Sequence, residues 1–410
     1  MSSMRQVITG FGWSSSAAMF SSVVALIKII ILARLLTKFD IGLISLTTIA
    51  LGVIEATTET GVNVTILQSK KKIEYFLDTA WVIAIARGVC IAIIMIVLAF
   101  FLQEFFEQPE LLPLISLAAL IPVIKGFINP SIIVFYKQLR FGLDTAYRSA
   151  PLFLDAIMAV TLAYFLRSAV AIPLAMIIAA LFEVTLSFIL SKHRPKFRYQ
   201  GDRAKVIFKQ ARSLSLSALL SYLNENADNF SIGKLTGVST LGVYDTMYKL
   251  GHKLSAQFAK SFHYGALPVM TQISDNQTLL RRTFWRTITL SVGLSSVIAV
   301  FLILFAQPLI AFGLGETWLE GLPLIKWLVL AGVIQSLSLG ASSLLIAKKR
   351  YFYMNFHGIA AISTMIILIV YLTPLYGIEG SAAAIFFSRL ISLPIILIGC
   401  FKVLYGKSRS

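Results

Sequence analysis

The stretch IGKLTGVSTLGV, residues 232–243, repeats the stretch LARLLTKFDIGL, residues 32–43, at an offset of 200. The matching positions are Arg34 and Lys234, Leu35 and Leu235, Ile41 and Leu241, and Gly42 and Gly242. A second match follows in the same order, because LPLI at 112–115 recurs at 322–325, at an offset of 210. Two matches at nearly the same offset indicate that the chain is built from two equivalent halves.

The sequence around these repeats is strongly apolar. Of its 410 residues, 57% are hydrophobic and only 13% are charged, and the mean hydropathy is +0.83. These values exclude an ordinary soluble globular protein. A run of about 20 apolar residues crosses a bilayer as a helix, and we find about twelve such runs. They lie near residues 13–36, 41–67, 78–103, 111–135, 150–167, 169–191, 213–233, 241–269, 287–311, 321–346, 354–373 and 378–401.

The basic residues fall mainly in alternate loops between these runs. With the N-terminus in the cytoplasm, the cytoplasmic segments hold 24 Lys and Arg residues and the opposite loops hold 3. Cytoplasmic loops of membrane proteins carry this excess, so we predict a multi-pass protein with both termini cytoplasmic. The net charge of +17 is then explained by topology, and no nucleic-acid partner is expected. The only two cysteines, Cys90 and Cys400, predict neither a disulfide nor a metal site.

The repeat offset covers six predicted spans, so both halves enter the membrane in the same orientation. We therefore predict an all-α integral membrane protein with two parallel six-helix lobes around a central cavity. The lobes comprise residues 1–191 and 213–410, and residues 192–212 form a basic cytoplasmic linker. The later part of this linker is expected to form a short amphipathic helix on the membrane surface.

The eighth run carries cations along one helical face. At 100° per residue, an arc of about 100° contains Lys249, Lys253 and Lys260. The same arc contains Asp245, His252 and His263. Because buried cations are costly in a bilayer, the pattern predicts a hydrated, positively charged cavity that favours anions. The alternative is that these cations pair with acids on neighbouring helices; the candidates are Glu55, Glu59, Asp155, Glu183, Glu225 and Asp228.

The seventh run contains an unusually polar segment, SYLNENADNFSIGKL at residues 221–235. Asn224, Glu225, Asp228 and Asn229 fall on one side of a helix drawn through it. Such side chains can ligate Na⁺, accept a proton or bond sugar hydroxyls. The alternative is a polar contact between helices, or an ion pair with the eighth run.

Several ordered motifs resemble one family. They are ARLLTKFDIGLISL with ETGVNVTILQSKK, then NENADNFSIGKLTGVSTLGVYDTMYKL, then ALPVMTQISDN with LLRRTF, and the basic-aromatic FYKQLRF. Together the motifs are similar to those of the polysaccharide transporters, including Wzx-type flippases, of the multidrug/oligosaccharidyl-lipid/polysaccharide exporter superfamily. The family's Trp after the fifth span is absent here, where the sequence reads AVAIPLA.

The resemblance implies a transporter of polyprenyl-pyrophosphate-linked oligosaccharides, for O-antigen, capsule or exopolysaccharide, in the bacterial inner membrane. Lys249, His252, Lys253 and Lys260 would then receive the anionic head group, with Lys28 and Arg87 contributing from the other lobe. Glu225 and Asp228, with Asn224 and Asn229, would bind a coupling Na⁺ or H⁺ or read sugar hydroxyls. Glu55 and Glu59 are the expected ion-pair partners of the cations. Membrane lipids, a polysaccharide polymerase and glycosyltransferases are the expected partners, and no resident cofactor or metal is expected.

Two other functions compete with this interpretation. A drug or metabolite exporter of the same superfamily would share the fold, but a cavity for cationic drugs would favour acids over the surplus of Lys and Arg found here. A membrane glycosyltransferase or polysaccharide polymerase would need a sizeable extramembrane region. The longest predicted one is the linker, and no nucleotide-binding loop or nucleophile motif appears. We therefore expect no enzymatic activity.

Overall fold

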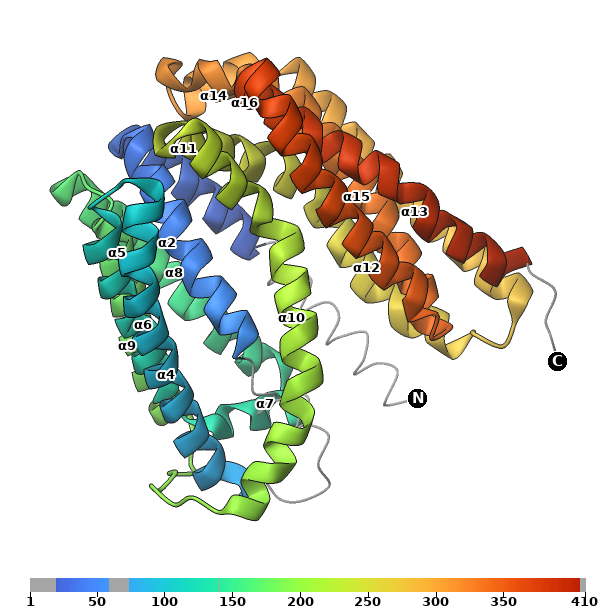
Figure 1. Ribbon diagram of the computed structural model, residues 1–410. Helices are drawn as coiled ribbons and strands as arrows, with labels where there is room; N and C mark the ends of the chain where they lie inside the picture. The colour runs from blue at the N-terminus through green and yellow to red at the C-terminus, as the bar shows by residue number, and fades with distance from the viewer. Residues whose placement is uncertain (1–19, 59–73, 139, 406–410) are drawn as a thin grey trace. The chain divides into compact units, whose positions relative to one another are not determined.

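The protein is almost entirely helical. The computed structural model describes residues 20–58, 74–138 and 140–405 (Figure 1). Contacts divide the chain into two units, Met1–Leu223 and Asn224–Ser410. The described residues contain no strand, so the predicted all-α fold class is confirmed.

The first unit begins with a described helix at residues 20–35. Its further helices are α2 (Lys38–Thr57), α4 (Glu74–Phe106), α5 (Leu111–Ala118), α6 (Leu120–Gly126), a 3₁₀ turn at Pro130–Ile132, α7 (Ile133–Lys137), α8 (Phe141–Leu166), α9 (Ala171–Leu190) and the first part of α10 (Gly201–Thr236). Helix α4 packs against α5 and α6, and α8 packs against α9.

The span made by α5, α6 and α7 is broken. The segments Leu111–Gly126 and Pro130–Lys137 meet at an angle of 64°. The break is held by polar groups: Trp81 donates its indole N–H to the Phe127 carbonyl at 3.1 Å. Asn129 accepts from the Ser131 amide and donates to the carbonyl of His193. The exposed backbone of the break is therefore satisfied within the protein, as helices interrupted at membrane depth require.

The predicted linker, residues 192–212, is part of the first unit and packs against its helices. The amide of Lys196 donates to Asp78 at 2.9 Å, and Arg203 lies over the Tyr75 ring at 4.2 Å. Ala204 and Ile207 are buried against α4 and α7. The predicted amphipathic segment is thus the first part of α10, and it packs onto protein.

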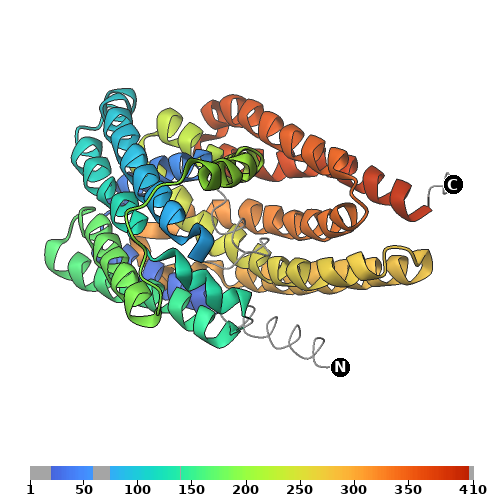
Figure 2. The same ribbon diagram turned by 90° about the horizontal axis from the view of Figure 1, so that it is seen from below.

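The second unit contains the rest of α10 and the following helices. These are α11 (Val238–Tyr248), a π-helical turn at Lys249–Lys253, α12 (Leu254–Gln272), α13 (Gln277–Leu304), α14 (Ala306–Gly313), a 3₁₀ turn at Glu316–Gly321, α15 (Leu322–Ala347) and α16 (Tyr351–Tyr405). Helix α15 contacts α12, α13 and α16, which run beside it (Figure 1, Figure 2).

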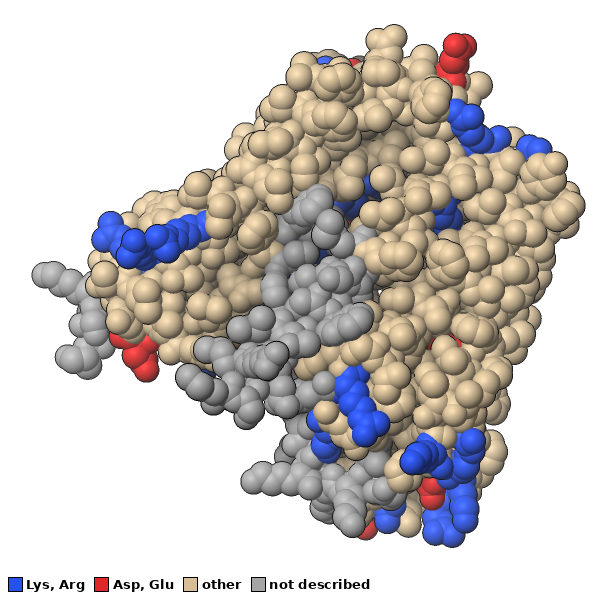
Figure 3. Space-filling model, turned by 180° about the vertical axis from the view of Figure 1, so that it is seen from behind, with Lys and Arg blue, Asp and Glu red and all other residues tan. Residues whose placement is uncertain are grey.

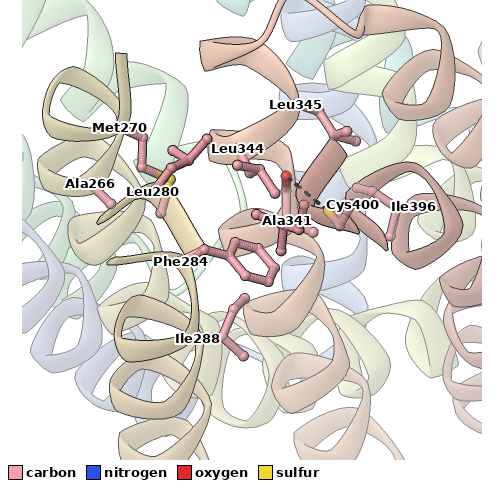
Figure 4. Packing of buried hydrophobic residues seen from close by; sticks show 11 residues of the cluster. Ala266, Met270, Leu280, Phe284, Ile288, Ala341, Leu344, Leu345, Ile396 and Cys400 are labelled. Carbon is pink, nitrogen blue, oxygen red and sulfur yellow. Dashed lines mark hydrogen bonds between the residues drawn. The ribbon is translucent and has the colours of Figure 1, made fainter. Parts of the chain in front are cut away.

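The core at one end of this unit shows why the four helices associate. Met270 of α12, Phe284 of α13 and Leu344 of α15 pack around one another (Figure 4). Ala341 and Cys400 bring α15 and α16 together, and the Cys400 thiol lies 3.6 Å from the Ala341 carbonyl. Small residues at this crossing allow the close helix packing on which association in membranes depends.

Seven described helices are long and apolar enough to cross a membrane, or eight if the broken pair counts as one span. Helix α16 counts once, although Gly377 interrupts it with φ 59° and separates the two final predicted spans. The predicted spans at 213–233 and 241–269 correspond to α10 and to α11 with α12, which are not among the counted helices. The twelve-span, two-lobe arrangement therefore stays a prediction. The first predicted span lies partly outside the described residues.

Both repeated stretches form a helix break. In the first, Thr37 caps α2 and exchanges hydrogen bonds with Asp40 at 3.1 Å in both directions. In the second, Gly237 takes φ 89° between α10 and α11. The aligned residues 37 and 237 therefore both end one helix and start another. The space-filling view shows a largely uncharged surface on which Lys and Arg gather in a few clusters (Figure 3).

Candidate functional site

The polar segment of α10 places two side chains in the interior of the second unit. Asp228 is 2% exposed and Asn229 is 3% exposed. The Tyr244 hydroxyl of α11 donates to Oδ2 of Asp228 at 2.6 Å. Among the described residues, Oδ1 of Asp228 and Oδ1 of Asn229 have no hydrogen-bond partner. Two adjacent buried acceptors without donors are unusual, because burying such groups unpaired is costly.

A second buried group lies around Arg389 of α16. This residue is 8% exposed and its guanidinium donates to the amide oxygen of Gln335 on α15. Helix α11, which carries Tyr248, also contacts α16. The Tyr248 ring stacks on the His252 imidazole, with centroids 4.6 Å apart. Within the described part of the chain, Nε of Arg389 and Nδ1 of His252 are buried without partners, so both buried groups contain polar atoms that are incompletely bonded.

The predicted head-group lysines of the second unit differ in their surroundings. Lys249 pairs with Asp245 at 2.5 Å, within one helix turn. Lys260 pairs with Glu225 at 3.0 Å, and their side chains are 39% and 49% exposed. Lys253 is exposed, and its ammonium lies 5.9 Å from the centroid of the Tyr248 ring. Of these three lysines, Lys260 pairs with an acid on a neighbouring helix, as the alternative to a free cationic face predicts, whereas Lys249 pairs within its own run.

The π-helical turn changes the predicted face of this run. Residues 249–253 form wider turns than an α-helix, so the side chains after them are rotated relative to those before. His252 is 4% exposed, whereas Lys253 beside it is exposed. A π turn in a helix is frequently found at a functional site. Here it orients His252 into the unit and Lys253 outward.

The predicted residues of the first unit also have partners. Lys28 pairs with Asp155 of α8 at 2.5 Å. Arg87 donates to the backbone carbonyl of Glu55 at 2.8 Å, so its contact with Glu55 is through the main chain. Glu59 lies outside the described residues. Asn224 is half-buried and Glu225 is exposed at the start of the second unit.

Four residues of the buried groups are not among the site residues predicted from sequence: Tyr244, Tyr248, Gln335 and Arg389. In sequence, Tyr244 and Tyr248 cannot be told from other aromatic residues of a helix, and Arg389 lies in an apolar run without a charged neighbour. The spacing of four between Tyr244 and Tyr248 was a usable signal, because it puts both rings on one helix face toward Asp228.

These features define a multi-pass helical membrane protein whose spans contain paired charges. Residues 31–323 match the family described as polysaccharide biosynthesis protein, and the chain belongs to this family. It is 20% identical to the lipopolysaccharide biosynthesis protein WzxC of Escherichia coli K12, over 85% of this chain and 72% of that protein. It is 21% identical to the teichuronic acid biosynthesis protein TuaB of Bacillus subtilis 168, over 84% of this chain and 72% of that protein.

Solved structures share the fold. The lipid II flippase MurJ in an inward closed conformation matches with a TM-score of 0.74 and 15% identity, over 95% of this chain and 89% of that chain. An inward-facing multidrug resistance MATE family transporter of the MOP superfamily matches with a TM-score of 0.68 and 16% identity, over 95% of this chain and 96% of that chain. The fold expected for this superfamily is thereby confirmed.

Proposed function

We propose that this protein moves a lipid-linked oligosaccharide, carried on a polyprenyl pyrophosphate, across the bacterial inner membrane. The observation that carries the proposal is the family match over residues 31–323. Relatives named for lipopolysaccharide and teichuronic acid biosynthesis support it. A fold shared with a lipid II flippase is consistent with the same task.

The charges of the second unit suggest how an anionic head group is received. Lys253 is exposed and has no carboxylate within ion-pairing distance among the described residues. The half-exposed pair of Lys260 and Glu225 is weakened by solvent. A pyrophosphate can therefore bind Lys253 directly and compete with Glu225 for Lys260. The ion pair of Lys249 with Asp245 is less exposed and would remain formed when the head group binds.

We further propose coupling to a gradient of Na⁺ or H⁺ through α10. Oδ1 of Asp228 and Oδ1 of Asn229, which have no donor among the described residues, are the kind of oxygen that ligates Na⁺ or accepts a proton.

The orientation and partners belong to the same proposal. The excess of Lys and Arg in alternate loops supports cytoplasmic termini in the inner membrane. Glycosyltransferases that build the oligosaccharide and a polymerase that consumes it would act beside this protein. We propose that the protein itself catalyses no covalent reaction.

The test is transport of a fluorescent lipid-linked oligosaccharide by the purified protein in proteoliposomes, scored by accessibility to an added glycosidase. We expect Lys253→Ala or Lys260→Ala to abolish transport and to abolish complementation of a flippase-null strain at normal membrane abundance. Lys402→Ala, at the exposed C-terminal end of α16, is the matched control.

Two outcomes would contradict the proposal. Full complementation by both lysine variants would refute the cationic route for the head group. Transport of cationic drugs without transport of the lipid-linked oligosaccharide would favour an exporter of the kind that shares this fold.

A further inference from the structure

The first unit contains a polar cavity at its broken span. The cavity has a volume of about 290 Å³ and is partly open, close to the lower end of the ~300–1,000 Å³ usual for small-molecule sites. Residues on both sides of the break line it, among them Gly126 and Pro130. Interrupted helices are found at membrane depth where they are buried in protein or line a cavity, and in transporters they form binding sites.

The polar lining of this cavity comes from α2, α4, α6, α8 and α9. It comprises Glu55, Arg87, Lys125, Tyr147, Arg148 and Glu183. Some of these side chains already form hydrogen bonds within the protein. Arg87 donates to the Glu55 carbonyl, and Nε of Arg148 donates to Asp144 at 2.9 Å. The remaining walls are apolar, with Ile91, Ile128 and Ile132 among them.

Several polar groups that line the cavity have no hydrogen-bond or ion-pair partner within the described part of the chain. The Tyr147 side chain is 5% exposed, and its hydroxyl is buried without a hydrogen bond. No ion pair joins Lys125, Glu55 or Glu183 to a charged group of the described residues. Unbonded groups of this kind at membrane depth are costly unless water or a ligand satisfies them.

The mixture of charges restricts the ligand. A small anion would gain from Lys125 and Arg148 but would be repelled by the two carboxylates. A small cation would meet the reverse problem. A neutral polyhydroxyl ring can donate to carboxylates and accept from the ammonium, guanidinium and phenol groups at once. Its C–H face can also lie against the isoleucine wall.

We propose that this cavity binds one pyranose ring. Its volume suits a single sugar ring with a few waters rather than a chain of sugars. The ring could belong to a free sugar or to the glycan of the lipid-linked substrate, and the second source rests on the proposed function. Glu183 and Glu55 would accept from ring hydroxyls, and Lys125 and Tyr147 would donate to them.

The test is equilibrium binding to the full-length protein in nanodiscs. The probes are radiolabelled methyl pyranosides of glucose, galactose and mannose, and N-acetylglucosamine, with phosphate and sodium as charge controls. We expect saturable binding of at least one pyranoside, weakened about tenfold or more by Glu183→Gln, as for a lost hydrogen bond to a charged group. Glu104→Gln, on an exposed part of α4 outside the cavity, should leave binding unchanged.

Tyr147→Phe provides a second variant that keeps the charge balance and the shape of the cavity. It should weaken the same binding several-fold while the protein elutes as the wild type does on gel filtration. The proposal is overturned if no pyranoside binds saturably, if both cavity variants bind like the wild type, or if phosphate or sodium saturates the cavity instead. A cavity filled only with water would give the first of these results.

The transport assay separates the two sources of the ring. If Glu183→Gln loses sugar binding and also slows transport of the lipid-linked oligosaccharide, the cavity binds a sugar of the transported glycan. If sugar binding is lost and transport is unchanged, the cavity takes a free sugar. Because binding is measured without transport, failure of the proposed function would leave the result for this cavity intact.

Discussion

The hydrogen bond between Tyr244 and Asp228 should contribute measurably to the stability of the second unit. Tyr244→Phe removes only the hydroxyl that donates to Oδ2 of Asp228. Both side chains are almost fully buried, at 0% and 2% exposure, so water cannot replace the lost donor. The other oxygen of the Asp228 carboxylate already lacks a partner in the part of the chain that the structure describes.

The size of the effect follows from the geometry. An O–H donor 2.6 Å from a carboxylate oxygen has the short length of a charge-assisted bond. Such bonds contribute about 1.5–3 kcal/mol, and an unsatisfied buried partner adds to the cost of losing them. We therefore expect Tyr244→Phe to lower the free energy of unfolding by about 2–3 kcal/mol. Tyr371→Phe, at a position that is 67% exposed, should change it by less than about 0.5 kcal/mol.

The assay is unfolding in mixed detergent micelles, followed by tryptophan fluorescence, for a double-mutant cycle. The cycle combines Tyr244→Phe with Asp228→Leu. Each single substitution leaves one buried polar group unpaired, whereas the double substitution removes both. The double variant should therefore be more stable than the sum of the single effects predicts, by about 1.5–3 kcal/mol.

Additive effects, to within about 0.5 kcal/mol, would refute this reasoning. They would mean that the two side chains do not interact in the folded protein. A cost of Tyr244→Phe no larger than that of the exposed control would refute it independently.

Three further effects can be measured by the same unfolding assay. Gly377→Ala should cost about 1–3 kcal/mol, because its φ of 59° with ψ of −147° is open essentially to glycine alone; Gly358→Ala, in a regular part of the same helix, should cost nothing, and equal costs would exclude a backbone effect. Lys28→Met should cost about 3 kcal/mol by leaving Asp155 unpaired, and adding Asp155→Leu should restore most of that loss; no recovery would show that the pair is not formed. Lys260→Gln should change stability by less than about 1 kcal/mol because its ion pair is half exposed, and a larger loss would indicate a buried pair.

The sequence predicted the helices and their breaks better than the contacts between them. Apolar runs and the repeat at residues 32–43 and 232–243 depend on local chemistry, and the helix breaks at Thr37 and Gly237 lie where the repeat puts them. The pairing of Lys249 with Asp245 was also readable, since a spacing of four places them on one face. The pairing of Lys28 with Asp155 joins residues 127 apart, and no local pattern specifies it.

The charged face predicted for the eighth run shows another limit of prediction from sequence. A constant 100° per residue places His252 and Lys253 in one arc, but the turn at residues 249–253 is π-helical. Packing of Gly251 against Leu328 and Val329 of α15 accompanies that wider turn. A period of 100° per residue assumes a regular α-helix, so the change in side-chain direction at this turn could not be obtained from periodicity.

The paired lysines alter the expected electrostatics of transport. A row of unpaired lysines would bind a pyrophosphate strongly and release it slowly. A lysine that is already paired with a carboxylate must give up that ion pair, so its net binding free energy is only the difference between the phosphate and the carboxylate interactions. Lys260 with Glu225 is such a pair, and its exposure keeps that difference small. A flippase must release the head group it has bound, so exchange between an internal carboxylate and a phosphate suits transport better than unopposed charge. Glu225→Gln should then tighten head-group binding and slow turnover together, and faster turnover in the proteoliposome assay would contradict this exchange.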